Sequence, residues 1–247
     1  MPIQIWRLVS IFFTAFVFGL SFREHGDLGE FALWTGALVG VVCIANWFVS
    51  KSAKLADRIY NAGLPVLYLA GYFGALAAVS APAAKIVVAA LGSSVFYLIE
   101  LFLLEPHPRA VREIAVLSTA FLLQVTLWAT SFFFVQPWWV LMSAVFFVST
   151  GLYFLVFFSG GLPHRRAFLW ALVCAFIQVE AAWAVFFWPV HFLTAAVVNF
   201  SFFYGIFVAC SMHFEGPINR RSLYFQISLI LIVLVVSLLS SPWSPIE

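Results

Sequence analysis

The sequence predicts an all-α integral membrane protein, a polytopic bundle of about nine transmembrane helices with little chain outside the bilayer. Of its 247 residues, 64% are hydrophobic, 19% are aromatic and only 9% are charged, and the mean hydropathy is +1.07. A soluble domain carries about 25% charged residues. The apolar residues also form stretches of about 20, the length that crosses the hydrocarbon core of a bilayer. A soluble globular fold is therefore excluded.

Charged residues, prolines and glycines divide the apolar sequence into nine predicted spans. These lie at residues 4–22, 30–50, 64–80, 84–104, 113–135, 138–159, 167–188, 190–211 and 222–241. The connections at Gln136-Pro137 and Pro189-Val190 are very short. They predict that the spans on either side form tight helical hairpins. We expect a single transmembrane domain over residues 1–247.

The basic residues indicate how the bundle is oriented in the membrane. If nine spans alternate, most of the twelve Lys and Arg residues fall on the side that holds the amino terminus. They are Arg7, Lys51, Lys54, Arg58, Arg109, Arg112, Arg165, Arg166, Arg220 and Arg221, whereas Arg23 and Lys85 fall on the opposite side. Cytoplasmic loops carry the excess of Lys and Arg. We therefore expect a cell membrane location, of the bacterial inner-membrane type, with the amino terminus cytoplasmic and the carboxyl terminus outside.

A recurring pattern predicts that the bundle is built from repeated two-helix hairpins in parallel orientation. Gln124-Val125, Trp128, Pro137, Gly151 and Arg165-Arg166 recur as Gln178-Val179, Trp183, Pro189, Gly205 and Arg220-Arg221. The candidate repeats are residues 64–112, 113–166 and 167–221. Alternatively, topology alone produces part of the pattern, because every such hairpin has a basic inner loop and an outer turn. The Gln-Val pair is the part that topology does not explain.

Glu180 is the outstanding polar residue of the predicted spans. A charge at the centre of a bilayer costs about 3 kcal/mol on insertion scales, and acidic residues there are functional by default. At helical spacing its face holds Phe176, Ile177, Trp183, Ala184 and Phe187. We expect a buried carboxyl in an apolar surround that favours its neutral form, which suits proton or cation transport. The alternative is a protonated Glu180 that donates one hydrogen bond to another helix.

Three side-chain amides accompany Glu180 as candidates for binding a substrate or proton. Gln178 lies on the other side of the same helix, and Gln124 and Asn199 lie at similar depth in spans five and eight. The face of Gln178 holds the small residues Ala171, Cys174, Ala175, Ala181 and Ala182, on which another helix can approach closely. The amides could form one interhelical network. The alternative is that each one stabilises helix packing separately.

Two further polar residues lie near the predicted inner ends of their spans. Asn46 belongs to span two and Glu100 to span four. We expect both to extend toward the interface, with Glu100 paired to the basic loop that holds Arg109 and Arg112.

The remaining reactive residues do not form a recognisable site. Cys43, Cys174 and Cys210 have no spacing for zinc, a disulfide or haem attachment and are interpreted as small packing residues. The five histidines include no pair at metal-binding spacing, and no phosphate or dinucleotide motif is present. We expect no cofactor, no metal and, with a net charge of only +2, no nucleic-acid partner.

The small-residue patterns predict close helix packing and therefore assembly. They are Gly36-x-x-x-Gly40, Gly71-x-x-x-Ala75 and Gly74-x-x-x-Ala78. The expected partners are the lipid bilayer and either other membrane subunits or further copies of this chain.

The last third of the chain resembles an uncharacterised multi-span membrane protein family of candidate-phylum bacteria. The residues that carry the resemblance are Gln178-Val179-Glu180 through Trp183, Trp188-Pro189, Tyr204-Gly205 and Ser241-Pro242-Trp243. That family has no assigned activity, so the resemblance implies a multi-span membrane fold without a mechanism.

Three function classes follow from these residues. The first is a small transporter or channel that uses the buried carboxylate of Glu180. The second is a structural or accessory subunit of a membrane complex. An intramembrane lipid-modifying enzyme is the least favoured, because no second catalytic group accompanies Glu180. The surroundings of Glu180 distinguish the classes: a hydrated cavity favours transport, a dry contact favours the accessory role, and exposure to lipid indicates a missing partner.

Overall fold

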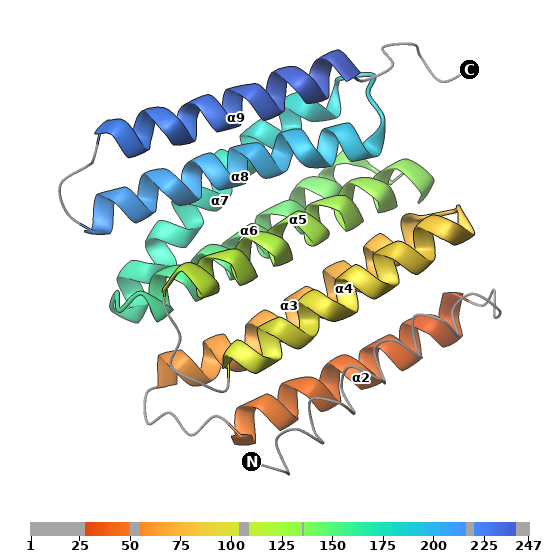
Figure 1. Ribbon diagram of the computed structural model, residues 1–247, viewed down its shortest axis with the longest axis horizontal. Coiled ribbons are helices and arrows are strands. Elements are labelled where there is room, and N and C mark those ends of the chain that lie inside the picture. Colours follow the sequence, from red (N-terminus) through yellow and green to blue (C-terminus); the bar gives the residue numbers. More distant parts are fainter. Residues whose placement is uncertain (1–27, 50–54, 104–108, 135, 216–219, 241–247) are drawn as a thin grey trace. The chain divides into compact units, whose positions relative to one another are not determined.

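The computed structural model describes residues 28–49, 55–103, 109–134, 136–215 and 220–240, which form eight α-helices and no strand (Figure 1). The helices are α2 (Leu28–Val49), α3 (Leu55–Ala78), α4 (Pro82–Leu103), α5 (Arg109–Phe134), α6 (Trp138–Ser159), α7 (His164–Phe186), α8 (Phe192–Glu215) and α9 (Arg220–Ser240). The predicted all-α class is confirmed.

Six of the described helices are long and apolar enough to cross a membrane, which suggests a membrane location. Their apolar segments are Arg58–Ala78, Pro82–Leu101, Arg112–Phe134, Trp138–Ser159, His164–Phe186 and Phe192–Phe214. Each of the last eight predicted spans coincides with one described helix. The first predicted span, 4–22, lies outside the described residues. The total of nine spans and the orientation of the termini therefore stay predictions.

The third helix begins earlier than the sequence predicts. The predicted span starts at residue 64, whereas α3 starts at Leu55 and continues through Pro65. The charged residues near its start had indicated a loop. Tertiary contacts explain the difference, because Tyr60 is buried and its hydroxyl donates a hydrogen bond to the backbone carbonyl of Arg112, at 3.3 Å.

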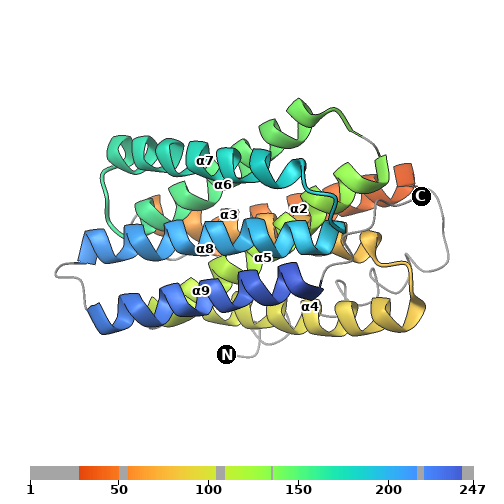
Figure 2. The same ribbon diagram turned by 90° about the horizontal axis from the view of Figure 1, so that it is seen from above.

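The described residues form two compact units, one ending at Leu123 and one beginning at Gln124, with the boundary inside α5. In the first unit, α3 packs against both α2 and α4. In the second unit, α6 packs against α7, and α8 packs against both α7 and α9 (Figure 2). Predicted repeat 113–166 covers the sequence of α5 and α6 and repeat 167–221 that of α7 and α8, and the repeats themselves stay a prediction.

Two tyrosines of α3 hold this helix against α4. The hydroxyl of Tyr68 donates to the backbone carbonyl of Gly92 at 2.8 Å, and the hydroxyl of Tyr72 donates to that of Ala89 at 3.1 Å. Both tyrosines are fully buried. A Cβ at Gly92 would overlap the ring of Tyr72, so only glycine leaves room for this contact.

The predicted small-residue seams have different outcomes. A Cβ at Gly71 would lie 2.8 Å from the backbone nitrogen of Leu123, so α3 and α5 approach closely there, as predicted. A Cβ at Gly36 or Gly40 would meet no described atom within 4 Å. The predicted seam of α2 is therefore not a close contact in the described part of the chain.

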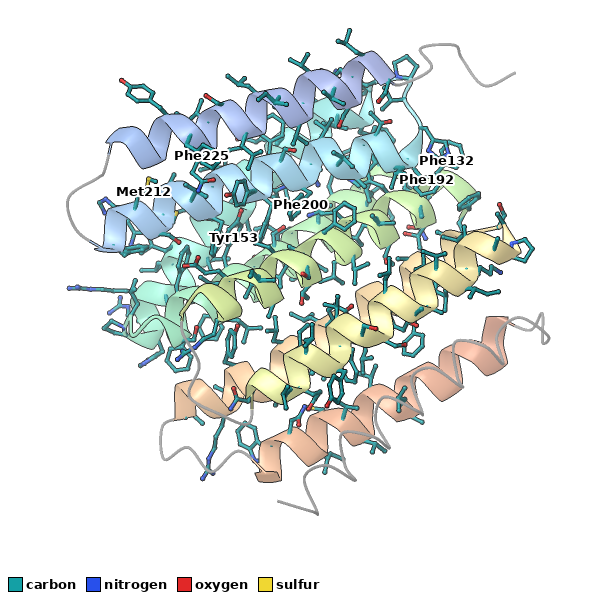
Figure 3. All side chains as sticks on the ribbon, in the orientation of Figure 1. Phe132, Tyr153, Phe192, Phe200, Met212 and Phe225 are labelled. Atoms are coloured by element: carbon teal, nitrogen blue, oxygen red, sulfur yellow. The ribbon has the colours of Figure 1, made fainter. Side chains whose placement is uncertain are left out.

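Aromatic side chains fill the centre of the second unit. Tyr153 of α6 and Phe203 of α8 stack with their ring centroids 4.7 Å apart, and both are fully buried. The hydroxyl of Tyr153 donates to the backbone carbonyl of Phe203 at 3.3 Å. Tyr153 thus lies in the side-chain layer between the helices of this unit (Figure 3).

Candidate functional site

Three of the four predicted site residues meet in one hydrogen-bonded network. Gln124 of α5, Gln178 of α7 and Asn199 of α8 are all fully buried in the second unit. The Nε2 of Gln178 donates to Oδ1 of Asn199 at 2.6 Å and to its backbone carbonyl at 2.8 Å. The Nδ2 of Asn199 donates to Oε1 of Gln124 at 2.7 Å. The amides therefore connect three helices, and their role in binding stays a prediction.

The network leaves one donor and one acceptor over. The Gln178 amide faces two oxygens of Asn199, so it must present its nitrogen to them. The side-chain amide of Asn199 is thereby oriented with its nitrogen toward Gln124, which must present its oxygen. Nε2 of Gln124 and Oε1 of Gln178 have no hydrogen-bond partner among the described residues. Nε2 of Gln124 can still donate one hydrogen bond, and Oε1 of Gln178 can still accept one.

Glu180 lies outside this network, on the exposed face of α7. Two residues turn an α-helix by about 200°, which places Glu180 almost opposite the buried Gln178. Its neighbours Phe176 and Trp183 are 60% and 52% exposed. No hydrogen bond or ion pair joins Glu180 to any residue in the described ranges. The expected burial of this carboxyl is therefore wrong, because its apolar surround faces outward.

Exposed residues of α7 and its end form a regular stripe around Glu180. Val173, Ile177, Glu180, Ala184 and Phe187 are all exposed and follow one another at spacings of four, three, four and three residues. This is the spacing with which one helix packs along another. We call these five residues the outer stripe of α7. Glu180 is its one charged member.

The first unit holds a buried carboxyl that the sequence predicts at the membrane interface. Glu100 of α4 is 2% exposed and Asn46 of α2 is 6% exposed. The Nδ2 of Asn46 donates to Oε1 of Glu100 at 2.7 Å. The expected extension of both side chains to the interface is therefore wrong. The two helices bring them together instead, and residues 54 apart give no periodic signal of that contact.

Two cysteines that the sequence did not pair lie in contact. The Sγ atoms of Cys174 in α7 and Cys210 in α8 are 3.5 Å apart, and both residues are free thiols. Cys174 lies one helical turn before Gln178, and Cys210 lies three turns after Asn199. The two steps differ by about two helical turns, so the pairing of the amides does not predict that of the thiols. No group of His, Cys, Asp and Glu suited to a metal occurs among the described residues.

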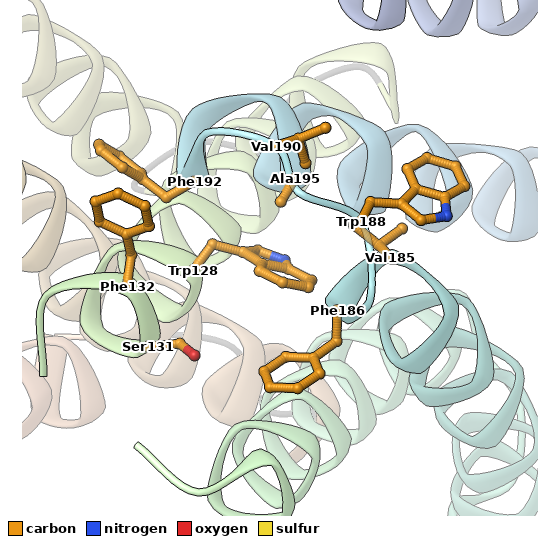
Figure 4. A pocket seen from close by; sticks show the side chains of 9 residues that line it. All are labelled: Trp128, Ser131, Phe132, Val185, Phe186, Trp188, Val190, Phe192 and Ala195. Carbon is orange, nitrogen blue, oxygen red and sulfur yellow. The ribbon is translucent and has the colours of Figure 1, made fainter. Parts of the chain in front are cut away.

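A pocket of about 200 Å³ lies one helical turn from the amide network, within the second unit (Figure 4). Trp128 and Ala195 line it, four residues after Gln124 and four before Asn199. The other lining residues are Ser131, Phe132, Val185, Phe186, Trp188, Val190 and Phe192. Aromatic rings dominate, and none of these nine side chains is charged. Sequence periodicity could not indicate this pocket, because it forms where α5, α8 and the end of α7 meet.

Comparison with known families identifies one match. A family model described as a protein of unknown function, DUF5656, matches residues 31–240. The match covers seven of the eight described helices completely and most of α2. No curated protein and no solved structure is detectably similar to the chain.

Proposed function

Because the chain belongs to the DUF5656 family, whose function is unknown, we propose from its own geometry that it is an accessory subunit of a membrane complex. The observation that carries the proposal is the exposed Glu180 on the outer stripe of α7. The partner is a transmembrane helix of another protein. It packs along this stripe and presents a basic side chain to Glu180.

The position of Glu180 supports a protein partner over lipid. At 1.5 Å per residue it lies about 9 Å from the Phe186 end of α7, too deep for a short carboxylate side chain to reach the interface easily. A charged group there costs about 3 kcal/mol on insertion scales if it faces hydrocarbon. A basic group at the same depth would offset much of that cost through charge-assisted hydrogen bonds.

The neighbours of Glu180 support a helix as the partner. Ala184 leaves space beside the carboxyl for a long basic side chain, and Val173 and Ile177 provide apolar contact on the other turns. A polar residue at one position of such a seam fixes the register and identity of the partner. Lys and Arg are the two side chains that carry a permanent charge far enough to reach a short carboxylate.

A photo-crosslinking experiment in native membranes tests this proposal. The crosslinking residue replaces Ile177 on the outer stripe or, as a matched control, Ile232, an equally apolar and exposed residue of α9. We expect an adduct with one other membrane protein from position 177, lost with Glu180→Leu and weakened with Glu180→Gln. Position 232 should not give that adduct.

The identity of the adduct decides between the occupants. A partner whose crosslinked helix carries Lys or Arg about 9 Å from the same membrane face supports the proposal. An adduct between two copies of this chain, an intramolecular adduct, or labelling of lipid alone overturns it.

The same proposal includes the finer architecture. Nine spans with a cytoplasmic amino terminus form one multi-pass domain of a bacterial inner membrane, built from hairpin repeats 64–112, 113–166 and 167–221. The shared contact of Gln124 and Gln178 with Asn199 supports the repeat, because these glutamines occupy equivalent positions in two of the hairpins. Cysteine accessibility from each side of the membrane, at His164 and Trp188, tests the orientation.

Transport is the second candidate, and Glu100 is the observation that favours it. This buried carboxyl, bonded to Asn46, is the kind of group that transporters use for protons and cations. Glu180, although exposed on α7, stays a candidate for that role, as do Gln124, Gln178 and Asn199, which are buried in the second unit. Proton flux into liposomes distinguishes the candidates: Glu100→Gln should abolish any flux if the chain transports, and wild-type liposomes should show none if it is accessory.

A further inference from the structure

Two thiols from neighbouring helices are in contact in the second unit. The Sγ atoms of Cys174 in α7 and Cys210 in α8 are 3.5 Å apart. The sulfurs of a disulfide are about 2.05 Å apart, so a shift of about 1.5 Å joins the two. The chain has three cysteines, and these two meet although they are 36 residues apart in the sequence. The contact therefore favours a disulfide between α7 and α8.

Helix packing alone does not require sulfur at these positions. The inner face of α7 has alanines on either side of Cys174, at Ala171 and Ala175, and both are fully buried. Another small residue at position 174 would continue this face equally well. Two thiols in contact add a bond that can form and break by redox chemistry.

The depth of the pair determines which reagents can reach it. At 1.5 Å per residue, Cys174 lies about 15 Å from the His164 end of α7, and Cys210 lies about 8 Å from the Glu215 end of α8. Both helices are long and apolar enough to span a membrane. A reagent dissolved in the bilayer can approach Cys210, which is partly exposed, whereas water-soluble disulfides stop at the headgroups. This depth favours a lipid-soluble electron acceptor.

Charge and ligand number disfavour a metal ion at the pair. A monovalent ion held by two thiolates leaves a net negative charge, which is costly inside a bilayer. A structural zinc ion needs four ligands, and no group of three or more His, Cys, Asp and Glu residues suited to a metal occurs in the described ranges. A pair of thiols and a disulfide are both uncharged. Thiol oxidation is therefore chemistry that the pair can perform without leaving a charge in the membrane.

We propose that Cys174 and Cys210 form a redox-active dithiol that reduces a lipid-soluble quinone. Two S–H bonds break and one S–S bond forms, and the two electrons and two protons that leave the sulfurs convert the quinone to a quinol. A quinone matches the pair because it takes up both electrons and both protons and is uncharged before and after. The pair lies off the outer stripe of α7, so this activity is independent of the partner proposed for Glu180.

A comparison of two oxidants tests the proposal on the unaltered full chain, with one chain in each lipid nanodisc. The reduced chain is mixed, without oxygen, with a decyl-tailed benzoquinone or with oxidised glutathione, which is water-soluble. All ring positions of the quinone are substituted, so the thiols cannot add to it. We expect one quinol for each Cys174–Cys210 disulfide, and about a tenth as much disulfide from glutathione in the same time. No disulfide from the quinone, or one that forms at least as fast with glutathione, overturns the proposal.

Three serine variants assign the electrons to the pair. Cys174→Ser and Cys210→Ser should each lose quinol formation, because a single thiol cannot form a disulfide within the chain. Cys43→Ser, the matched control in the first unit, should retain it. Circular dichroism shows whether each variant keeps its helices. Quinol formation that persists without Cys174 or without Cys210 assigns the electrons to another group and overturns the proposal.

Discussion

The two units contain carboxyls in opposite settings. Glu100, in the unit that ends at Leu123, is buried and bonded to Asn46, whereas Glu180, in the unit that begins at Gln124, is exposed. Their sequence neighbours predict the opposite, because Glu180 has the more aromatic surround and was expected to be the buried carboxyl. In a membrane helix the large apolar residues face lipid, and small residues face the protein. An apolar surround on such a helix therefore indicates exposure.

Oxidation of two cysteines on the inner face of α7 tests the orientation of this helix. Oxidation of the native chain should join Cys174 to Cys210, because a disulfide needs the sulfurs to move from 3.5 Å to about 2.05 Å. Cys43 belongs to the first unit and should remain open to thiol labelling. Mass spectrometry of the labelled peptides gives the yield. If Cys174 and Cys210 stay reduced while Cys43 reacts, α7 is rotated and Glu180 is not on its outer face.

Removing the partner of the buried carboxyl should have the next largest effect. Asn46→Leu takes away one donor from the buried carboxyl of Glu100, and a hydrogen bond to a carboxyl contributes about 2 kcal/mol to the free energy of unfolding. Ile44→Leu, at a 60% exposed position of the same helix, is the control and should change little. Unfolding by steric trapping measures both. Equal stability of the two variants would mean that the Asn46 bond contributes nothing.

The central amide of the network should matter somewhat less. Asn199→Leu removes the side-chain bonds to Gln178 and Gln124, while the backbone carbonyl of residue 199 can still accept from Gln178. Interhelical hydrogen bonds in membranes contribute about 0.6 kcal/mol on average and up to about 1.7 kcal/mol each. We expect a loss of about 1 to 2 kcal/mol, measured in the same host lipid. Gln124→Leu removes one bond and should cost about half as much. A larger loss from Gln124 than from Asn199 would contradict the order of the network.

Glu180 should have the smallest effect on the isolated chain. Glu180→Leu removes no hydrogen bond to the described residues and replaces a carboxyl by an apolar group on an apolar face. The free energy of unfolding of the purified chain should change by less than about 0.5 kcal/mol or rise. A loss comparable to that of Asn46→Leu would show that Glu180 has a structural partner within the chain.

Sequence periodicity predicts where helices lie and which of their faces are buried, but not which helices are neighbours. Hydropathy placed eight helices, and the small-residue face of α7 placed Gln178 inside, since one helix determines both signals. The meeting of Gln124 with Asn199, and of Asn46 with Glu100, depends on which helices are neighbours. A hydropathy pattern contains no information about which helices are neighbours. The amide network was therefore one of two alternatives, and the positions expected for Asn46 and Glu100 were wrong.

The start of α3 shows the same limit at the level of secondary structure. Charged residues after Leu55 predict a loop, yet the helix continues because Tyr60 is buried against the backbone of Arg112. Pro65 removes one donor from the helix without ending it. Local propensity was overridden here by packing, which a single sequence does not show.

The paired tyrosines of α3 limit how the first unit can move. Tyr68 and Tyr72 are one turn apart and hold carbonyls of Gly92 and Ala89, one turn apart on α4, while the Tyr72 ring occupies the gap above Gly92. Sliding one helix along the other by a turn would offer the ring of Tyr72 a side chain in place of glycine. Helices α3 and α4 therefore have one permitted register and move together as a rigid body. A conformational change of this unit would therefore have its hinges at the ends of the α3–α4 pair.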